Sequence, residues 1–177
     1  FTLTHYNQGA ALVHIYQDGT VQVNHGGTEM GQGLHTKILG VAMRELGVPA
    51  AAIRMMHTST AKVPNTSATA ASAGADLNGA AVRNACSTLR ERLAPVAARL
   101  LAKQVGREVA AGDLRFEDSC AKVYSPALAA PRGDERPRVE GGGVVPFADV
   151  CKQCYVDRVS LSATGYYATP GIHWDWS

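Results

Sequence analysis

Apolar and polar side chains alternate over residues 11–25, on both sides of the pair Asp18-Gly19. Such alternation is typical of strands that bury one face, and an Asp-Gly pair supplies the positive φ angles of a tight turn. The stretch therefore predicts a β-hairpin. Shorter patterns of the same kind predict a strand near 53–57, a small hairpin over 114–124 and a final strand over 159–167.

Two other stretches repeat apolar residues every three or four positions, which is typical of helices. The apolar face of the first consists of Leu34, Ile38, Val41, Ala42 and Leu46, and Gly47 follows where a C-cap is expected. The apolar positions of the second are Val82, Cys86, Leu89, Leu93, Val96 and Leu100. Pro95 lacks a backbone donor, so we expect it to kink this helix or to start a new one. A short helix is predicted over 146–156, with Pro146 in its first turn.

These elements predict the fold class α+β, a mixed two-layer domain in which glycine-rich loops join strands to helices. The stretch PRGDERPRVEGGG (131–143) has the composition of a linker and predicts a flexible loop near 128–144. The chain begins at Phe1 rather than at Met, so we expect residues 1–177 to be one partial domain of a longer protein. Such a piece exposes apolar surface, and Leu93, Val96 and Leu100 are the candidates for exposure or for dimer contacts.

Composition narrows the class of protein. Apolar residues make up 46% of the chain and charged residues 18%, which is typical of a globular protein and not of a disordered one. A formal net charge of +2 is too small to suggest nucleic acid or a membrane surface as a partner. No apolar run approaches the roughly 20 residues that span a bilayer. Four cysteines in a chain of this size do not indicate a disulfide framework, so we expect a reducing, cytoplasmic compartment.

The side chains most often used in catalysis and metal binding give weak signals. Cys151 and Cys154 have no second cysteine pair or histidine pair at zinc spacing, which favours core packing. His25 and His35 flank a glycine-rich stretch, but no third metal ligand is indicated. Glu29 lies between the two histidines. It could act as a general base, but a lone carboxylate in a loop more commonly caps backbone N–H groups.

The stretch HGGTEMGQGLHTK (25–37) places four glycines between a predicted strand and a predicted helix. Its spacing fits neither the dinucleotide-binding G-x-G-x-x-G motif nor the phosphate-binding G-x-x-x-x-G-K-S/T motif. Gly31-Gln32-Gly33 at a helix start still suits an anion or a polar ring, because free N–H groups point outward and the helix dipole favours negative charge. The alternative is a tight turn that binds nothing, and this motif alone does not decide between the two.

A second stretch, TSATAASAGAD (66–76), repeats the arrangement with small residues at a predicted helix start. Small residues at such a place either pack against another element or let a ligand reach the backbone amides. Two junctions of this kind in one chain favour a shared ligand. We therefore expect a phosphate-bearing cofactor that is held by the main chain rather than by charged side chains.

The same motifs carry a family resemblance. GGTEMGQGLHTK (26–37), followed by TSTAKVPNTSATAASAGADLNGAAV (58–82), resembles the molybdenum-cofactor-binding region of xanthine dehydrogenases, and RVSLSATGYYATP (158–170) resembles a later piece of that domain. The resemblance implies that the chain binds molybdopterin, with Ala71 near the molybdenum. The cofactor-binding residues that it implies are Met30, Gly31, Gln32, Ala70, Ala71, Ser72 and Gly74. Related enzymes often carry serine at the position of Gly74, so only a backbone contact is expected there.

The resemblance also implies a substrate and partners. Phe1 and Thr2 look like the aromatic ring and the hydroxyl that line the purine pocket, and such a pair suits a flat heterocycle. The implied activity is that of a xanthine dehydrogenase, which oxidises hypoxanthine and xanthine to urate with NAD as the final acceptor. The implied partners are a subunit or domain that carries FAD and 2Fe–2S clusters, neither of them expected on this chain, and a second copy of the large subunit.

Parts of such an enzyme are missing from this sequence. The family's GEPP-type glutamate motif is absent, so we assign no catalytic residue and expect the chain to be inactive alone. No protein ligand to the metal is expected, since in the family the pterin dithiolene supplies sulfur. Two alternatives stay open. One is a fragment of another molybdenum hydroxylase, such as an aldehyde oxidase or a nicotinate-type dehydrogenase, and the other is a non-catalytic module for carrying the cofactor or for assembly.

Overall fold

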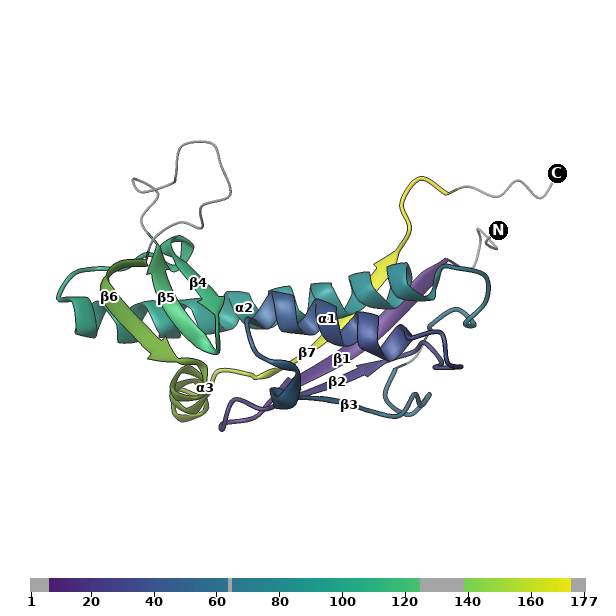
Figure 1. Ribbon diagram of the computed structural model, residues 1–177, viewed down its shortest axis with the longest axis horizontal. Coiled ribbons are helices and arrows are strands. Elements are labelled where there is room, and N and C mark those ends of the chain that lie inside the picture. Colours follow the sequence, from purple (N-terminus) through teal and green to yellow (C-terminus); the bar gives the residue numbers. More distant parts are fainter. Residues whose placement is uncertain (1–6, 64, 125–138, 173–177) are drawn as a thin grey trace.

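A four-stranded sheet in the order β3-β2-β1-β7 forms the base of the molecule. The computed structural model describes residues 7–63, 65–124 and 139–172. Figure 1 shows this sheet beneath two helices. The predicted hairpin is present and has two further strands beside it, with β7 antiparallel to β1 and β3 parallel to β2. The four strands are β1 (Gln8–Ile15), β2 (Val21–His25), β3 (Ile53–Met55) and β7 (Ser162–Ala168).

The turn of the β1–β2 hairpin differs in detail from the prediction. Within the Asp18-Gly19 pair only Gly19 has a positive φ, of 84°. Asp18 instead accepts hydrogen bonds on Oδ1 from the N–H and the hydroxyl of Thr20, at 2.9 and 2.7 Å, which is a local turn that aspartate favours. The resulting register places Val13 opposite Val23, and both side chains are fully buried.

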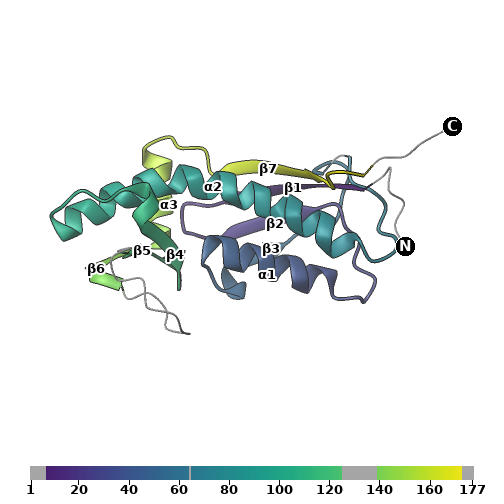
Figure 2. The same ribbon diagram turned by 90° about the horizontal axis from the view of Figure 1, so that it is seen from above.

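Two helices, α1 (Leu34–Leu46) and α2 (Gly74–Val105), lie side by side on the sheet (Figure 2). α1 ends where predicted, at Gly47, whose φ is 68° and whose N–H donates to the Met43 carbonyl at 2.9 Å. The residues that α1 buries are Leu34, Ile38, Ala42 and Leu46. The predicted apolar face is therefore confirmed, with Val41 only partly buried.

α2 is one helix of 32 residues that contains Pro95, so the proline does not begin a new helix. The helix runs along the first sheet and on to a second one (Figure 1). The prediction that Leu93 and Val96 are exposed or form dimer contacts is wrong, because both sheets cover the helix and leave them 0% and 4% exposed. Leu100 is half-buried. No described helix, α2 included, combines the length and the hydrophobicity that a bilayer crossing requires.

The second sheet has the order β4-β5-β6 and packs with α2 and α3. Its strands are β4 (Leu114–Glu117), β5 (Cys120–Tyr124) and β6 (Val139–Pro146), and α3 spans Phe147–Val156. The small hairpin and the short helix are confirmed. The predicted loop is wrong for residues 139–144, because β6 pairs antiparallel with β5; residues 125–138 lie outside the described ranges. The short turns η2 (Ala50–Ala52) and η3 (Ala111–Asp113) precede β3 and β4.

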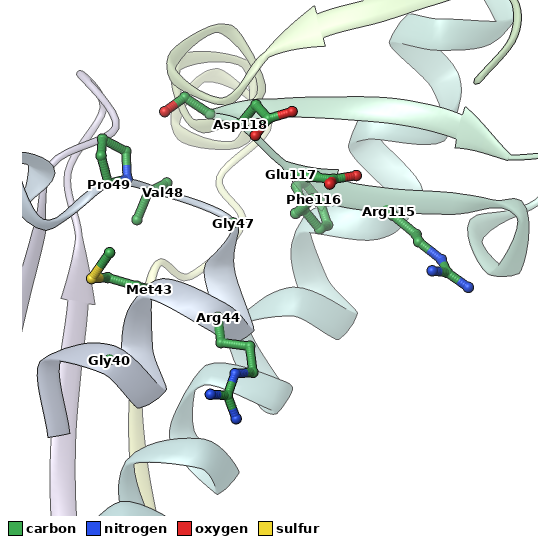
Figure 3. Close-up of a pocket in the computed structure, with 11 residues that line it drawn as sticks. Gly40, Met43, Arg44, Gly47, Val48, Pro49, Arg115, Phe116, Glu117 and Asp118 are labelled. Carbon is green, nitrogen blue, oxygen red and sulfur yellow. The ribbon is translucent and has the colours of Figure 1, made fainter. Parts of the chain in front are cut away.

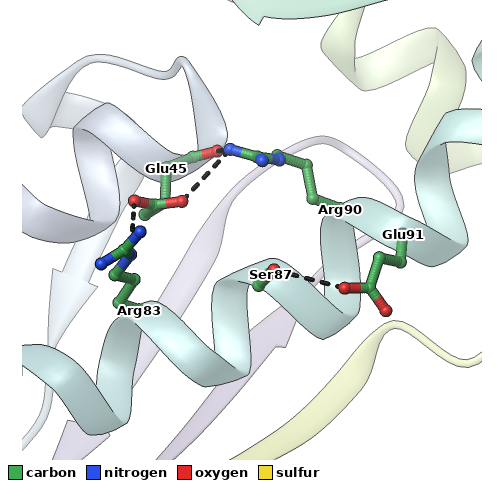
Figure 4. Close-up of polar contacts among 5 residues, drawn as sticks. All are labelled: Glu45, Arg83, Ser87, Arg90 and Glu91. Atoms are coloured by element: carbon green, nitrogen blue, oxygen red, sulfur yellow. Dashed lines mark hydrogen bonds and ion pairs between the residues drawn. The ribbon is translucent and has the colours of Figure 1, made fainter. Parts of the chain in front are cut away.

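Charged side chains join the outer sides of α1 and α2. Glu45 of α1 pairs with Arg83 at 3.6 Å and with Arg90 at 3.1 Å, both on α2 (Figure 4). Because the two arginines are well exposed, each pair contributes no more than about 1 kcal/mol to stability. The helix pair is held mainly by the buried apolar residues beneath these charges.

β7 and α2 approach each other at backbone distance. A Cβ added to Gly165 of β7 would lie 1.9 Å from the carbonyl oxygen of Ala81 and 2.7 Å from the backbone nitrogen of Ala85. Both alanines are fully buried, so the contact is made by small residues on both sides. This contact fixes where the first turns of α2 lie relative to the sheet.

Candidate functional site

The two predicted junctions lie at one end of the first sheet. The glycine loop (residues 26–33) joins β2 to α1, and the small-residue loop (residues 66–73) leads into α2. Both helices begin at the same end of the molecule (Figure 1). The second junction is less direct than predicted, because residues 56–73 separate β3 from α2.

Hydrogen bonds join the glycine loop to the segment that follows β3. The N–H of Thr28 donates to Oγ1 of Thr69 at 2.8 Å, and Oγ1 of Thr58 donates to the Gly27 carbonyl at 2.6 Å. A Cβ added to Gly26 would lie 2.2 Å from Oγ1 of Thr66, so this approach requires glycine. Sequence reasoning missed these threonines, because the bonded residues are 41 and 31 positions apart and no local pattern marks them.

Glu29 holds the glycine loop and the start of α1 with its carboxylate. Oε1 accepts the N–H groups of Gly31 and Gly33 at 2.9 and 3.1 Å, and Oε2 accepts the N–H of His35 at 2.8 Å. Hydrogen bonds to the ionised form, chiefly the one from His35, hold the pKa of Glu29 below its ordinary value. The capping interpretation of this residue is confirmed.

Met30, Gly31 and Gln32 form the exposed tip of the glycine loop. The side chain of Met30 is 69% exposed. The Gln32 side chain folds back over the loop, where its Oε1 accepts the Met30 N–H at 2.6 Å and its Nε2 donates to the Thr28 carbonyl at 2.8 Å. Gly31 and Gly33 have φ angles of 96° and 76°, and no described atom lies within 4 Å of a Cβ added to either. A ligand can therefore approach the main chain of this tip.

Ala70, Ala71 and Ser72 form an exposed stretch just before α2. Ala71 has a left-handed φ of 53°, a conformation that is rare outside glycine and is often found at functional sites. The N-cap of α2 is Ala73, which has no side-chain acceptor for the first N–H groups of the helix. A Cβ added to Gly74 would make ordinary contacts, the nearest at 3.7 Å, so close packing does not require glycine at this position.

Comparison with known proteins identifies the family of the chain. The family described as molybdopterin cofactor-binding domain matches residues 1–177. The chain belongs to this family. The predicted resemblance is thereby confirmed, together with the α+β fold and molybdopterin as the cofactor.

Relatives of this molybdopterin cofactor-binding domain are much longer proteins. The xanthine dehydrogenase of Dictyostelium discoideum is 40% identical over 172 residues, which are 97% of this chain and 10% of that protein. Aldehyde oxidase 2 of Cavia porcellus is 62% identical over 96 residues, which are 54% of this chain and 7% of that protein. The crystal structure of quinoline 2-oxidoreductase from Pseudomonas putida 86 matches with a TM-score of 0.73 at 28% identity, covering 93% of this chain and 19% of that one. The chain thus spans a tenth or less of the curated relatives named here.

The described residues of the domain fit a cofactor of this kind. A phosphate group needs N–H donors in a positive potential, and the start of α2 supplies both, because a long helix begins there after small residues. Asp76 in that first turn opposes an anion, but it is exposed to solvent. At α1, by contrast, Glu29 already accepts the N–H groups. Within the described ranges, no group of three or more His, Cys, Asp or Glu side chains could hold a metal ion.

A cavity of about 800 Å³ lies apart from the two loops, between the C-terminal end of α1 and the β4–β5 hairpin (Figure 3). Met43, Arg44 and Phe116 are among the residues that line it, and none of the predicted cofactor-binding residues is. The cavity is therefore not part of the candidate site. Phe1 and Thr2, which are predicted to line the substrate pocket, lie outside the described residues.

The buried cysteines give a testable expectation. Cys151 and Cys154 are free and buried, which confirms core packing, and burial raises the pKa of these thiols to about 12 and about 11. The reactive thiolate is then scarce near neutral pH. We expect an alkylating reagent at about pH 8 to label the partly buried Cys120 first and these two roughly a hundredfold more slowly. Mass spectrometry of the native chain over time measures the rates, and equal rates for Cys154 and Cys120 would contradict the expectation.

Proposed function

We propose that this domain binds molybdopterin between the glycine loop and the small-residue loop, as part of the catalytic subunit of a molybdenum hydroxylase. The observation that carries the proposal is that the two loops are joined where their exposed stretches begin. Thr28 lies two residues before Met30, Thr69 directly precedes Ala70, and the two threonines are hydrogen-bonded at 2.8 Å. The exposed main chain of the glycine loop therefore begins close to that of the small-residue loop, so one ligand can contact both.

Each loop has its own share in this proposal. Met30, Gly31 and Gln32 contact the cofactor from the glycine loop, where the amide of Gln32 can exchange its bonds within the loop for bonds to a polar ring. Ala70, Ala71 and Ser72 line it from the other side, with Ala71 near the molybdenum, and Gly74 contributes its backbone. When bound, the cofactor supplies the redox centre that takes electrons from the substrate. The residues of this chain bind and orient it.

For the whole enzyme we propose a xanthine dehydrogenase, which oxidises hypoxanthine and xanthine to urate with NAD as the final acceptor. The proposal is supported by the xanthine dehydrogenase match over 97% of the chain. Its partners in this proposal are a subunit or domain with FAD and 2Fe–2S clusters and a second copy of the large subunit, in the cytoplasm. An aldehyde oxidase is the second candidate, because aldehyde oxidase 2 of Cavia porcellus is 62% identical to this chain, although over only 96 residues.

Cofactor binding is tested in the complete polypeptide that contains this chain, expressed in a host that makes molybdopterin. Gln32→Ala is expected to lower the molybdenum content per polypeptide about tenfold, because one or two hydrogen bonds to the cofactor are lost. Gln22→Ala is the matched control, since Gln22 lies on β2 outside both loops and accepts a hydrogen bond from the hydroxyl of Tyr16. A folded Gln32→Ala protein with unchanged molybdenum content would contradict the assignment.

The substrate is tested with hypoxanthine, xanthine and simple aldehydes, by NAD reduction and by oxygen consumption. Purine-dependent formation of NADH supports the xanthine dehydrogenase proposal, and oxidation of aldehydes without purines supports the second candidate. Retention of molybdenum without oxidation of any of these compounds points to the non-catalytic module. The 177-residue chain alone is expected to form no urate, and measurable urate from the purified, cofactor-loaded chain would overturn that expectation.

A further inference from the structure

His25 ends β2 and directly precedes the glycine loop. Its side chain is 1% exposed, and its Nδ1 accepts the N–H of Gly27 at 3.1 Å. A nitrogen that accepts this bond must carry a lone pair, so the proton of the neutral ring is on Nε2. The bond from the second residue after the acceptor resembles the local turn that asparagine and aspartate make with their side-chain oxygen.

Gly27 is the point at which several elements meet. Its N–H donates to His25, and its carbonyl accepts the Thr58 hydroxyl at 2.6 Å. A Cβ added to Gly27 would lie 2.6 Å from Cδ2 of Leu34 on α1 and 2.8 Å from Nδ2 of Asn78 on α2. Whatever holds this peptide in place therefore also holds the glycine loop against both helices.

The surroundings of His25 favour a neutral ring. The ring of His35 on α1 meets it edge to face, with the centroids 5.1 Å apart and an interplanar angle of 86°. Nε2 of each ring is buried and has no hydrogen-bond partner among the described residues. The titratable groups that act on His25 are His35 and Glu29, while the nearby side chains of Thr58 and Asn78 carry no charge.

We propose that His25 is a positioning residue, which holds the glycine loop in its cofactor-binding shape through the lone pair of its neutral Nδ1. That the loop matters for the cofactor rests on the function proposed above. That His25 holds the Gly27 peptide by a hydrogen bond does not depend on that function. Protonation of Nδ1 removes the acceptor and turns two N–H groups toward each other. The Gly27 peptide is then released, and the loop loses its attachment to β2.

The pH at which this happens follows from the ring's environment. Burial, helped by His35 and opposed by Glu29, lowers the pKa of His25 from 6.5 to about 4. The unfolded chain therefore takes up the proton at a higher pH than the folded chain does. Stability from the neutral ring is fully present above about pH 6.5 and is lost as the pH falls toward about 4.

Nuclear magnetic resonance of the 177-residue chain tests the hold on Gly27 without any cofactor. Wild type is expected to show the Nε2–H form of His25 at about pH 7, and the Gly27 amide signal should shift as that ring titrates well below the ordinary histidine range. His25→Asn keeps an acceptor at this place and should protect the Gly27 amide from exchange at both about pH 7 and about pH 4. His25→Leu has no acceptor, and exchange should be about tenfold faster at both pH values. An Nδ1–H form of His25, or a Gly27 amide protected equally in His25→Leu, would overturn the proposal.

Molybdenum content of the complete polypeptide separates this proposal from the function proposed above. Wild type is expected to lose molybdenum when it is held at about pH 4 rather than about pH 7, His25→Asn to keep it at both, and His25→Leu to have little at either. His14→Asn is the matched control, because His14 lies on β1 outside the loop and should behave as wild type. If His25→Asn and His25→Leu lose molybdenum to the same extent, the positioning role of His25 is wrong. If wild type holds no molybdenum at any pH while Gly27 behaves as expected, the proposed function fails and the hold of His25 on the loop stands.

Discussion

Gly165→Ala is expected to lower the free energy of unfolding of the chain by about 3 kcal/mol or more. The new methyl group would lie 1.9 Å from the carbonyl oxygen of Ala81 and 2.7 Å from the backbone nitrogen of Ala85. Both of these are main-chain atoms of α2, so no side chain can rotate away, and strand and helix must separate. Urea unfolding followed by circular dichroism measures the change as a shift of the midpoint.

Gly40→Ala is the matched control for this substitution. Gly40 lies in α1, and no described atom lies within 4 Å of an added Cβ. Alanine there raises helix propensity and is expected to stabilise the chain by roughly 0.5–1 kcal/mol. The same chemical change thus has opposite signs at the two sites. A Gly165→Ala chain with the wild-type midpoint would show that β7 and α2 do not pack as described.

Glu29→Ala is expected to loosen the glycine loop and the first turn of α1 together. The substitution removes the acceptor of three main-chain N–H groups, those of Gly31, Gly33 and His35. Hydrogen exchange at these amides should become about tenfold faster or more, and the complete polypeptide should lose most of its molybdenum. Both measurements are needed, because the first reports on the loop and the second on the cofactor.

Glu29→Gln and Glu91→Ala complete the test of this carboxylate. Glutamine keeps one neutral acceptor and should give exchange rates between those of wild type and Glu29→Ala. Glu91 accepts the Ser87 hydroxyl at 3.3 Å on the exposed side of α2 (Figure 4) and lies outside both loops, so Glu91→Ala should behave as wild type. The pKa of Glu29 is lower in the folded chain than its ordinary value. The ionised carboxylate therefore stabilises the folded chain above the ordinary carboxyl pKa, and this stabilisation is lost as the pH falls through the lowered pKa. Unchanged exchange in Glu29→Ala would refute the capping role.

Elements whose cause is local could be predicted from the sequence. The β1–β2 hairpin follows from alternation around Gly19, and α1 follows from its apolar spacing and the left-handed cap at Gly47. Even there, the exact turn could not be predicted, because the Oδ1 of Asp18 competes for the backbone of Thr20.

Elements whose cause is distant in the chain were predicted poorly. β6 looks like a linker because of its glycines, yet a Cβ added to Gly143 would lie 2.6 Å from Cγ1 of Val105. Glycine stands there because the strand passes close to α2, and composition alone does not distinguish such a glycine from a flexible one. The burial of Leu93 and Val96 has the same origin, since the sheets that cover α2 come from parts of the chain distant from the helix in sequence.

The candidate site divides in the same way. The two junctions of glycine and small residues at helix starts could be recognised from local composition, whereas the assignment of residues 30–32 and 70–72 to the cofactor rests on the family resemblance and stays a prediction. The bond that joins them, from Thr28 to Thr69, spans 41 positions of sequence and has no local signature. The supporting role of His25 was also missed, because a single histidine beside a glycine gives no pattern for a side chain that accepts from the main chain.

The close contact between Gly165 and the first half of α2 also bears on how this family can diverge. A helix of 32 residues could slide or roll under changes at its far end, and such movement would carry the small-residue loop with it. Backbone contact at Ala81 and Ala85 sets the axial register of the helix near the loop, so the far end can change independently. Changes in the β4–β6 sheet can therefore occur with little effect on the geometry at the two loops.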